Sequence, residues 1–317
     1  MILVTGGLGF IGSNFVELAV EKKIPGFESE NFLVLDSETY AGSRSNLSKA
    51  IGSGKVELVI GDIRDTKIVE NCVAKSTGVI HFAAESHVDR SIENPKLFLE
   101  TNVMGTFNLL NSVSTKSLRI LVVSTDEVYG SIESGSASES YTIAPSSAYS
   151  ASKASADLIA GAFAKTYGTD VVITRSVNNY GFMQHSEKFI PTIIESIAKN
   201  RKIPIYGNGV NIRDWMHVED HCRGIALAYI YGKKSDVFNF GSHDYFNNLE
   251  LAKLFLRHFS KDIEMIDFVI DRKGHDTRYS VDFSKAKSEL GWEPKRLLRE
   301  SISELSTWYL ERHSSKK

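Results

Sequence analysis

The first half of the chain alternates short apolar runs with longer stretches of helical periodicity. Most positions within each run are apolar, as in a strand that is buried on both faces of a parallel sheet. The stretches between the runs place apolar residues three or four positions apart, as amphipathic helices do. The predicted strands are Leu3–Thr5, Phe32–Leu35, Val56–Ile60, Val79–Phe82, Ile120–Ser124 and Val171–Arg175. This alternation predicts an α/β fold with a Rossmann-type doubly wound parallel sheet.

The later part of the chain has a different organisation. We expect residues 1–181 to form a dinucleotide-binding domain, to which the chain returns at about 211–240 through a short strand at Val237–Phe240. Residues 182–210 and 241–317 mix shorter helices and strands. They are expected to form a smaller mixed α/β C-terminal domain that binds the substrate.

Composition excludes several classes of protein. The 317 residues are 42% hydrophobic and 24% charged, with a formal net charge of −2, as in an ordinary globular protein. No charge excess favours nucleic acid or a membrane surface, and no apolar run approaches the ~20 residues of a membrane span. Cys72 and Cys222 lie far apart and make no metal-ligand spacing, so we expect no metal and a cytoplasmic location.

A glycine-rich turn lies between the first predicted strand and the first predicted helix. Gly6, Gly9 and Gly12 would let the backbone turn tightly and approach a pyrophosphate, while the helix N-terminus supplies hydrogen-bond donors. Asp36 ends the second strand, where an acid can accept hydrogen bonds from both adenosine-ribose hydroxyls. Since an acid repels a ribose phosphate, NAD is favoured over NADP. The alternative is an ordinary Asp in a turn.

The strand Ile120–Ser124 is followed directly by Thr125, Asp126 and Glu127. Ligands of open α/β sheets bind at the carboxyl ends of the strands, so these side chains are predicted to project into a cleft. The alternative is a turn whose acids face water. Tyr149 and Lys153 follow on a predicted helix, four positions apart, so both side chains can meet the same ligand.

Other polar residues leave alternatives open. Asp62 can meet an adenine amino group or cap the next helix, and His81, inside an apolar strand, is predicted to be structural. Arg213 and Arg272 are candidates for binding phosphate. Alternatively, they are surface arginines that pair with the neighbouring Asp214 and Asp271. Asn247 and Asn248 are expected to cap a helix over Leu249–Phe259.

Together these segments resemble the extended short-chain dehydrogenase/reductases, and most closely the nucleotide-sugar 4,6-dehydratases typified by dTDP-glucose 4,6-dehydratase. The resemblance runs from Val4 to about Trp292. The pair STDEVYG and YSASK is the most discriminating, since 4-epimerases and decarboxylases of this superfamily usually lack Asp-Glu after the Thr. The other matching segments are TGGLGFIGSNF, LDSETYAG, HFAAESHVDRSI, NNYG, EKFIP, PIYGNG, IRDWMHVEDH and DRKGHD.

The resemblance implies a role for particular residues. The implied catalytic residues are Thr125, Asp126, Glu127, Tyr149 and Lys153. The implied NAD-binding residues are Gly6, Gly9, Phe10, Ile11, Gly12, Asp36, Thr39, Asp62, Ile63, Ala83, Ala84, Thr101, Tyr149, Lys153 and Asn179. The implied nucleotide-sugar-binding residues are Ser86, Thr125, Asn178, Lys188, Phe189, Pro204, Tyr206, Arg213, Asn248, Arg272 and His275.

The resemblance also implies a reaction. A nucleoside-diphosphate glucose, dTDP-glucose in the typical case, is oxidised at C4, loses water across C5 and C6, and regains hydride at C6 to give a 4-keto-6-deoxy sugar, as in deoxysugar biosynthesis. A homodimer is implied as well. The alternatives are a sugar-nucleotide 4-epimerase or related NAD enzyme, and a non-catalytic NAD-binding regulator. Phe182 and Ser186 stand where the family commonly has Pro. The resemblance is therefore a stronger guide to the reaction type than to the identity of the substrate.

Overall fold

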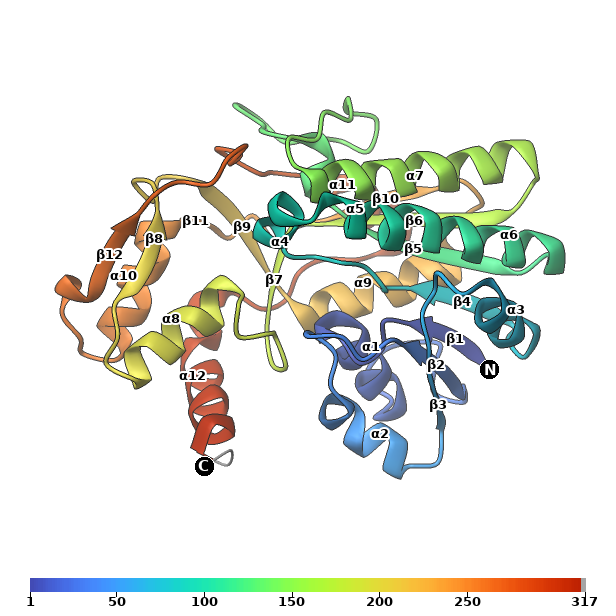
Figure 1. Cartoon of the computed structure of the whole chain (residues 1–317), viewed down its shortest axis with the longest axis horizontal. Helices are drawn as coiled ribbons and strands as arrows, with labels where there is room; N and C mark the ends of the chain where they lie inside the picture. Colours follow the sequence, from blue (N-terminus) through green and yellow to red (C-terminus); the bar gives the residue numbers. More distant parts are fainter. Residues whose placement is uncertain (315–317) are drawn as a thin grey trace.

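A seven-stranded sheet forms the centre of the larger part of the molecule (Figure 1). The structure is a computed structural model and describes residues 1–314. The strand order is β10-β6-β5-β4-β1-β2-β3, and every neighbouring pair is parallel. The strands are β1 (Ile2–Thr5), β2 (Phe32–Asp36), β3 (Val56–Ile60), β4 (Gly78–His81), β5 (Arg119–Thr125), β6 (Asp170–Ser176) and β10 (Val237–Phe240). The predicted doubly wound parallel sheet is confirmed, including the return of the chain at Val237–Phe240.

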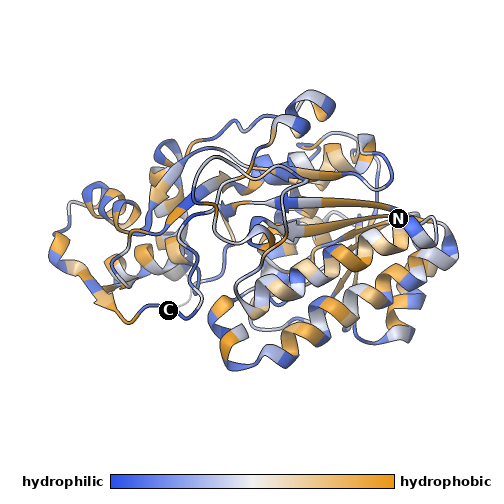
Figure 2. Ribbon diagram, turned by 90° about the horizontal axis from the view of Figure 1, so that it is seen from above, coloured by the Kyte–Doolittle hydropathy of each residue, from blue (hydrophilic) through white to orange (hydrophobic). Residues whose placement is uncertain are grey.

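Helices cover both faces of this sheet, because neighbouring residues of each strand point to opposite sides. Leu3 of β1 packs with α3 (Thr66–Ala74), α6 (Thr106–Lys116) and α7 (Ala148–Thr166). Val4 packs on the other face with α1 (Phe10–Val20), α2 (Ser48–Gly52) and α9 (Val218–Tyr231). Figure 2 shows the strands as hydrophobic along most of their length, as expected for strands buried on both faces.

Short elements connect these layers. Before α2 lies η1 (Arg44–Leu47), and after β5 lies η3 (Asp126–Tyr129). The segment that leads into α6 consists of α4 (Val88–Glu93), α5 (Pro95–Phe98) and the π-helix η2 (Leu99–Gly105). π-helical turns are rare and are frequently found at functional sites. Asn102 in this turn makes contacts described below.

The smaller part has its own core of aliphatic and aromatic side chains, which includes Tyr180, Trp215 and Phe255. One three-stranded sheet has the order β11-β9-β7, and β8 pairs with β12 in parallel. Its strands are β7 (Asn178–Tyr180), β8 (Ile203–Tyr206), β9 (Ile212–His217), β11 (Tyr245–Asn247) and β12 (Ile266–Val269). Its helices are α8 (Phe189–Ala198), α10 (Asn248–His258), η4 (Ile263–Met265) and α12 (Leu298–Ser314). A mixed α/β part is therefore present, as predicted.

Helix α11 (Ser284–Leu290) departs from the expected division of the chain. Val281, Ala286, Leu290 and Trp292 pack with β10 and α9 in the core of the larger part, although they lie within 241–317. The boundary between the two cores in space therefore differs from the expected boundary along the sequence.

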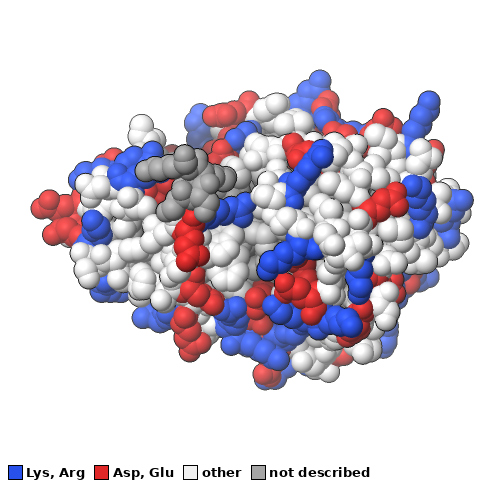
Figure 3. Space-filling view, turned by 90° about the horizontal axis from the view of Figure 1, so that it is seen from below, with Lys and Arg blue, Asp and Glu red and all other residues white. Residues whose placement is uncertain are grey.

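The order of the strands reverses between β1 and β4. At such a switch point, neighbouring loops leave in opposite directions and open a crevice at the carboxyl ends of the strands. Basic and acidic side chains are mixed over the face shown in Figure 3. Within residues 1–314, no helix combines the length and the apolar character that crossing a lipid bilayer requires.

Candidate active site

Two adjoining cavities lie at the carboxyl ends of the parallel strands, with volumes of about 480 Å³ and about 380 Å³. Glu127, Asn178, Phe189 and Arg272 are among the residues that line both. All the predicted catalytic and NAD-binding residues line the first cavity. The predicted substrate-binding residues line the first cavity, the second, or both. The structure therefore gathers the predicted site residues at one place, and their individual roles stay predictions.

The glycine turn before α1 fits a dinucleotide. Gly6 has a φ of +72°, and a Cβ added to it would lie 2.5 Å from the backbone nitrogen of Ala83. A Cβ on Gly12 would lie 2.4 Å from the Gly6 carbonyl oxygen. No side chain caps α1, so its first N–H groups face the cavity as donors for an anion. This backbone accepts no side chain at Gly6 or Gly12 and is suited to a pyrophosphate.

Asp36 lies at the end of β2, and 8% of its surface is exposed. Its two carboxylate oxygens accept hydrogen bonds from Leu8 N at 2.9 Å and Glu38 N at 2.8 Å. Burial raises the pKa of Asp36, while these two backbone donors oppose that shift. Each oxygen keeps a second lone pair, which can accept a ribose hydroxyl.

Asp62 does not cap the helix after β3, so that alternative was wrong. The N-cap of α3 is Asp65, whose carboxylate accepts hydrogen bonds from Lys67 N and Ile68 N. Asp62 lines the first cavity and accepts hydrogen bonds from the backbone and guanidinium of Arg64. The N-cap of α3 lies three residues after Asp62 because the chain makes a turn before the helix begins. A hydrogen bond from Asp65 N to Asp62 O closes this turn.

Asp126 and Glu127 do not form a solvent-facing turn. Asp126 is 3% exposed; one of its oxygens accepts a hydrogen bond from the Thr125 hydroxyl at 3.2 Å, and the other has no partner within residues 1–314. Burial, followed by the nearby charge of Glu127, raises the pKa of Asp126 well above its usual value. Burial also raises the pKa of Glu127, but the cations Arg213 and Lys188 oppose the shift. The two neighbouring carboxyl groups thus differ in environment, with Asp126 better suited to hold a proton.

Tyr149 and Lys153 share one face of α7. Ser147 caps this helix in a capping box with Ser150, which fixes where the first turn starts. Lys153 is 5% exposed, and its ammonium donates a hydrogen bond to Val123 O at 2.8 Å. Burial lowers the pKa of Lys153. Burial and the charge of Glu127 raise the pKa of Tyr149, while the Thr125 side chain acts in the opposite direction.

Arg213 and Arg272 do not pair with their sequence neighbours, so the surface alternative was wrong for both. Arg213 is 7% exposed, donates hydrogen bonds to Ile212 O and Asp276 O, and lies over the Tyr279 ring at 4.2 Å. Because its hydrogen bonds go to neutral carbonyl oxygens, the guanidinium can also attract an anion in the second cavity. Arg272 pairs instead with Asp89, at 2.7 Å between Nε and Oδ1, because the fold brings α4 against the loop after β12.

Other predicted substrate residues surround these arginines. Lys188 donates a hydrogen bond to Ser86 O at 2.8 Å, and Tyr206 donates one to Asp89 Oδ2 at 3.2 Å. His275 lies 2.7 Å from Asp271, measured from Nδ1 to Oδ1. Asn248 is the first residue of α10, and Asn247 alone is its N-cap, so the predicted cap is confirmed for one of the two asparagines.

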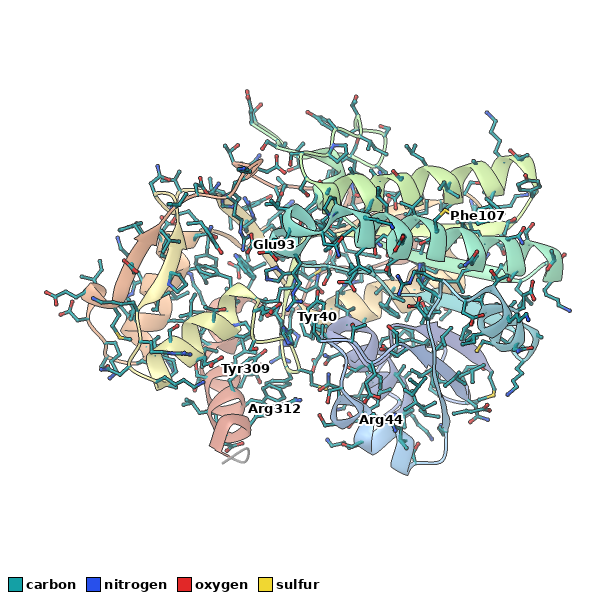
Figure 4. All side chains as sticks on the ribbon, in the orientation of Figure 1. Tyr40, Arg44, Glu93, Phe107, Tyr309 and Arg312 are labelled. Atoms are coloured by element: carbon teal, nitrogen blue, oxygen red, sulfur yellow. The ribbon has the colours of Figure 1, made fainter. Side chains whose placement is uncertain are left out.

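Two cavity residues, Tyr279 and Tyr40, and one residue behind the first cavity, Asn102, were missed because nothing local marks them. Tyr279 is 6% exposed and its hydroxyl donates to Asp276 Oδ2 at 2.7 Å, and it lies 3.5 Å from Glu127 Oε2. Asn102 joins the loop after β4 to α7 through Glu85 and the Ser152 hydroxyl. Tyr40, labelled in Figure 4, lies between the two parts of the molecule and lines the first cavity. An Asn in a helix or a Tyr near the C-terminus gives no sequence signal for these contacts.

His81 is structural, as predicted. It is 1% exposed, and its ring nitrogens lie 2.7 Å from Thr5 Oγ1 and 2.9 Å from Thr106 Oγ1. Burial lowers its pKa to about 3. The ring therefore joins β4 to β1 and α6 as a neutral group.

Comparison with known proteins gives matches over nearly the whole chain. Residues 3–305 match the family model described as GDP-mannose 4,6 dehydratase. The chain is 44% identical over 310 residues to a dTDP-glucose 4,6-dehydratase of an Actinoplanes species, covering 97% of both chains.

Solved structures show the same relationship. The dTDP-glucose 4,6-dehydratase DesIV of Streptomyces venezuelae, solved with NAD and TYD bound, has a TM-score of 0.97 and 44% identity over 99% of this chain and 98% of that one. A UDP-glucose 4-epimerase of Thermotoga maritima has a TM-score of 0.90 at 28% identity, over 98% and 99% of the two chains. With its Asp126-Glu127 pair and full-length similarity, this chain belongs to the nucleotide-sugar 4,6-dehydratase family of extended short-chain dehydrogenase/reductases.

Proposed function

We propose that this protein is an NAD-dependent nucleotide-sugar 4,6-dehydratase that converts dTDP-glucose to its 4-keto-6-deoxy product. The observation that carries the proposal is the pair of neighbouring carboxyl groups, Asp126 and Glu127, at the carboxyl end of β5 in the cavity that Tyr149 and Lys153 also line. The full-length similarity to dTDP-glucose 4,6-dehydratases supports it.

Three side chains of this chain would carry the proton transfers, and two more would support them. When bound, NAD would supply the acceptor for the C4 hydride, whose removal makes the C5 proton acidic, and would give that hydride back at C6 once water has left. Tyr149 accepts the proton of the C4 hydroxyl, and Thr125 holds that oxygen. Glu127 then takes the C5 proton, and Asp126 donates a proton to the leaving C6 hydroxyl. Lys153 stabilises the Tyr149 phenolate. The raised pKa of Asp126 supports its role as general acid, and the cations beside Glu127 support its role as general base.

The ionisation of Tyr149 requires a nearby cation. Burial and Glu127 raise its pKa, so the protein around it disfavours the phenolate in the absence of ligands. A partly desolvated ammonium close by acts in the opposite direction more strongly than an exposed one would. Lys153, which is 5% exposed, is placed for that role on the same face of α7.

We propose the following placement of the ligands. NAD lies in the first cavity against the predicted residues of 1–181, and the nucleotide sugar extends into the second cavity between Arg213 and Arg272. Residues 182–210 and 241–317 supply most of the sugar-nucleotide contacts, although 281–292 pack in the larger part. A cytoplasmic location belongs to the proposal, since Cys72 and Cys222 are both free and buried.

The second candidate is a sugar-nucleotide 4-epimerase, favoured by the TM-score of 0.90 to the Thermotoga enzyme. An epimerase has no elimination step and so has no use for a buried acid beside a second carboxylate. A non-catalytic NAD-binding regulator would have no use for any of the five predicted catalytic residues. The intact set from Thr125 to Lys153 therefore favours the dehydratase.

The deciding experiment incubates the purified protein with dTDP-, UDP-, GDP- and CDP-glucose and analyses the products by mass spectrometry. A dehydratase gives a product lighter by one water, with a ketone that absorbs after alkali. The double variant Asp126→Asn, Glu127→Gln is the matched control and gives no such product. An isomer of unchanged mass would establish the epimerase instead, and absence of turnover on all four would favour the regulator. Release of NAD on denaturation, measured by absorbance, tests the cofactor independently.

A homodimer is also part of the proposal. Leu99 and Met104 of η2, Phe107 of α6 and Leu158 of α7 are apolar and 38 to 62% exposed on neighbouring helices. A second copy of this chain would cover them. Leu158→Asp should convert the dimer to monomers in sedimentation velocity. Ile270→Asp, at an apolar residue 92% exposed elsewhere, should leave the state unchanged. A wild-type monomer at micromolar concentration would contradict this prediction.

A further inference from the structure

A buried ion pair lies beside the predicted catalytic residues and has no assigned role. Asp157 of α7 and Arg175 of β6 approach to 2.9 Å between Oδ2 and Nε, with side-chain exposures of 1% and 6%. Burying two charges costs several kcal/mol per ion, so a pair of this kind is weak evidence for a contribution to stability. Its position relative to Lys153 suggests a different function.

Tyr149, Lys153 and Asp157 follow one another at intervals of four residues on α7 and therefore share one face. Within residues 1–314, no carboxylate lies within 4.0 Å of the Lys153 ammonium, whose hydrogen bond goes to the neutral Val123 carbonyl. Asp157 is the anion that favours the charged form of Lys153. The buried carboxylate of Asp157 therefore interacts with two buried cations, Lys153 and Arg175.

Arg175 is held from three directions. Its Nη1 donates a hydrogen bond to the Tyr129 hydroxyl at 2.8 Å and one to Glu139 O at 3.2 Å. The Tyr129 hydroxyl in turn donates to Asn239 Oδ1 of β10 at 2.8 Å. A guanidinium stays charged at any working pH, so Arg175 is a fixed positive charge beside Asp157.

We propose that Asp157 and Arg175 are positioning residues that set the charge of Lys153: the carboxylate holds the buried ammonium protonated beside Tyr149, and the guanidinium limits that effect by drawing the carboxylate to itself. This inference rests on the proposed function of Tyr149 and Lys153. It assigns the ion pair to the reaction and not to the rigidity of the sheet.

The other titratable groups around Lys153 and Tyr149 are the same in every variant below. On η3 they are Asp126 and Glu127, and on β4 His81, which is neutral because burial lowers its pKa to about 3. Tyr40, from the loop after β2, also raises the pKa of Tyr149. None of these pairs with Asp157 or Arg175, so their contribution cancels in the comparison.

The proposal predicts opposite shifts for two neutralising variants. An anion raises the pKa of an ammonium and a cation lowers it, so Asp157→Asn should lower the pKa of Lys153 and Arg175→Gln should raise it. Each shift should be about one pH unit at the few-ångström separations involved. The alkaline limb of the pH profile of C4 oxidation, followed by nicotinamide absorbance, should move to lower pH in Asp157→Asn and to higher pH in Arg175→Gln.

The chain offers a matched control. Arg119 of β5 and Asp170 of β6 form a second Arg–Asp pair, at 2.9 Å between Nε and Oδ2, and Asp170 lies at the opposite end of β6 from Arg175. Asp170→Asn and Arg119→Gln remove the same kind of contact far from Lys153. Both should leave the alkaline limb unchanged. The conservative variants Asp157→Glu and Arg175→Lys keep the charges and should restore the wild-type limb.

A second measurement is independent of turnover. The pKa of Lys153 can be read by NMR from ¹³Cε-labelled lysine in the purified protein, with Lys153→Met identifying the signal. Opposite shifts of the Lys153 pKa in the two variants support the charge coupling, whether or not the protein dehydrates a nucleotide-glucose. Absence of dehydration would overturn only the proposed function. Shifts in the same direction, or none, in variants that fold would overturn this inference while leaving the dehydratase intact.

Discussion

Two adjacent carboxyl groups with different surroundings define the chemistry at the residue scale. Asp126 is 3% exposed, with one oxygen that has no partner within residues 1–314, whereas Glu127 is only half-buried and close to cations. Both pKa values are raised, but that of Asp126 more, because burial is less opposed there. The proton is therefore held more readily by Asp126 than by Glu127, which suits one residue to act as an acid and the other as a base.

Glu127→Gln should separate oxidation from elimination. Loss of a positioned base typically slows proton abstraction by about 10² to 10⁴, so product formation should fall by at least about 100-fold. Reduced nicotinamide should still appear on mixing with substrate, measured by absorbance at the nicotinamide band. Glu93→Gln, at an exposed glutamate of α4 labelled in Figure 4, is the control and should change neither step. Wild-type product formation by Glu127→Gln would remove Glu127 from the role of base.

Asp126 also makes stability depend on pH. A carboxyl group whose pKa is raised in the folded state stabilises that state less as the pH rises above the unfolded value of 3.8. Asp126→Asn removes this penalty, so the variant should be more stable than wild type to urea at about pH 8, with a smaller difference at about pH 5. An Asp126→Asn protein equally or less stable at about pH 8 would contradict the raised pKa.

At the scale of elements, helix α12 connects the two parts of the molecule. The Tyr309 hydroxyl donates to Gly181 O and Gln184 O, and Trp308 packs against Phe182 with ring centroids 5.4 Å apart. Arg312 donates to Asn46 Oδ1 at 2.9 Å, and Asn46 donates to the carbonyl of Leu8 in the glycine turn (Figure 4). Phe182, where the family commonly has Pro, therefore contacts α12 through its ring, and its carbonyl accepts a hydrogen bond from Asn14 of α1 in the cofactor-binding part.

Removing this contact should loosen the bound cofactor. Arg312→Ala and Phe182→Ala each take away one link between α12 and the segments around the first cavity. An aromatic pair of this type contributes about 0.5 to 1.5 kcal/mol, so NAD dissociation should become roughly threefold to tenfold faster. Stopped-flow exchange with a fluorescent analogue measures the rate. Arg257→Ala, at an exposed arginine of α10, should not change it. An unchanged rate in both test variants would show that α12 does not retain the cofactor.

At the scale of the whole molecule, three buried histidines lie in different parts of the fold. His81 is in β4, His217 ends β9 and His221 is in α9, and all are at most 1% exposed. Burial lowers the pKa of each to about 3. His221 also lies 2.9 Å from Asn179 Oδ1, measured from Nδ1. The neutral rings lie in the sheet, in the smaller part and beside the first cavity. Protonating them therefore lowers the free energy of unfolding through contacts in all three regions.

The protein should therefore lose stability in mild acid. A group whose pKa is lowered on folding stabilises the folded state above its unfolded pKa of 6.5, and that contribution falls as the pH drops below 6.5 toward 3. At about pH 5.5 each histidine costs about 1.4 kcal/mol, or roughly 4 kcal/mol for all three. Urea unfolding at about pH 7.5 and about pH 5.5 measures the loss. His258→Gln, at an exposed histidine, should not change it, and an equal urea midpoint at both pH values would contradict the three lowered pKa values.

The sequence by itself determined the features that arise within a few consecutive residues. Strands such as Ile120–Ser124 need only a continuous apolar run, and the glycine turn needs only Gly6, Gly9 and Gly12 between a strand and a helix. The Asp126–Glu127 pair and the spacing of Tyr149 and Lys153 follow from strand ends and helix periodicity in the same way. The resemblance to a family then connected these separate patterns to a reaction.

Only the tertiary structure decided which distant residues meet. Arg272 pairs with Asp89, 183 positions away, and not with Asp271 beside it, and Asp157 and Arg175 meet because α7 packs against β6. Tyr279 reaches Glu127 across 152 positions. The packing of distant elements determines which group lies next to a buried charge, and no local sequence pattern predicts that contact. The same packing sets burial, and burial is what moves the pKa values of Asp126, Tyr149 and Lys153.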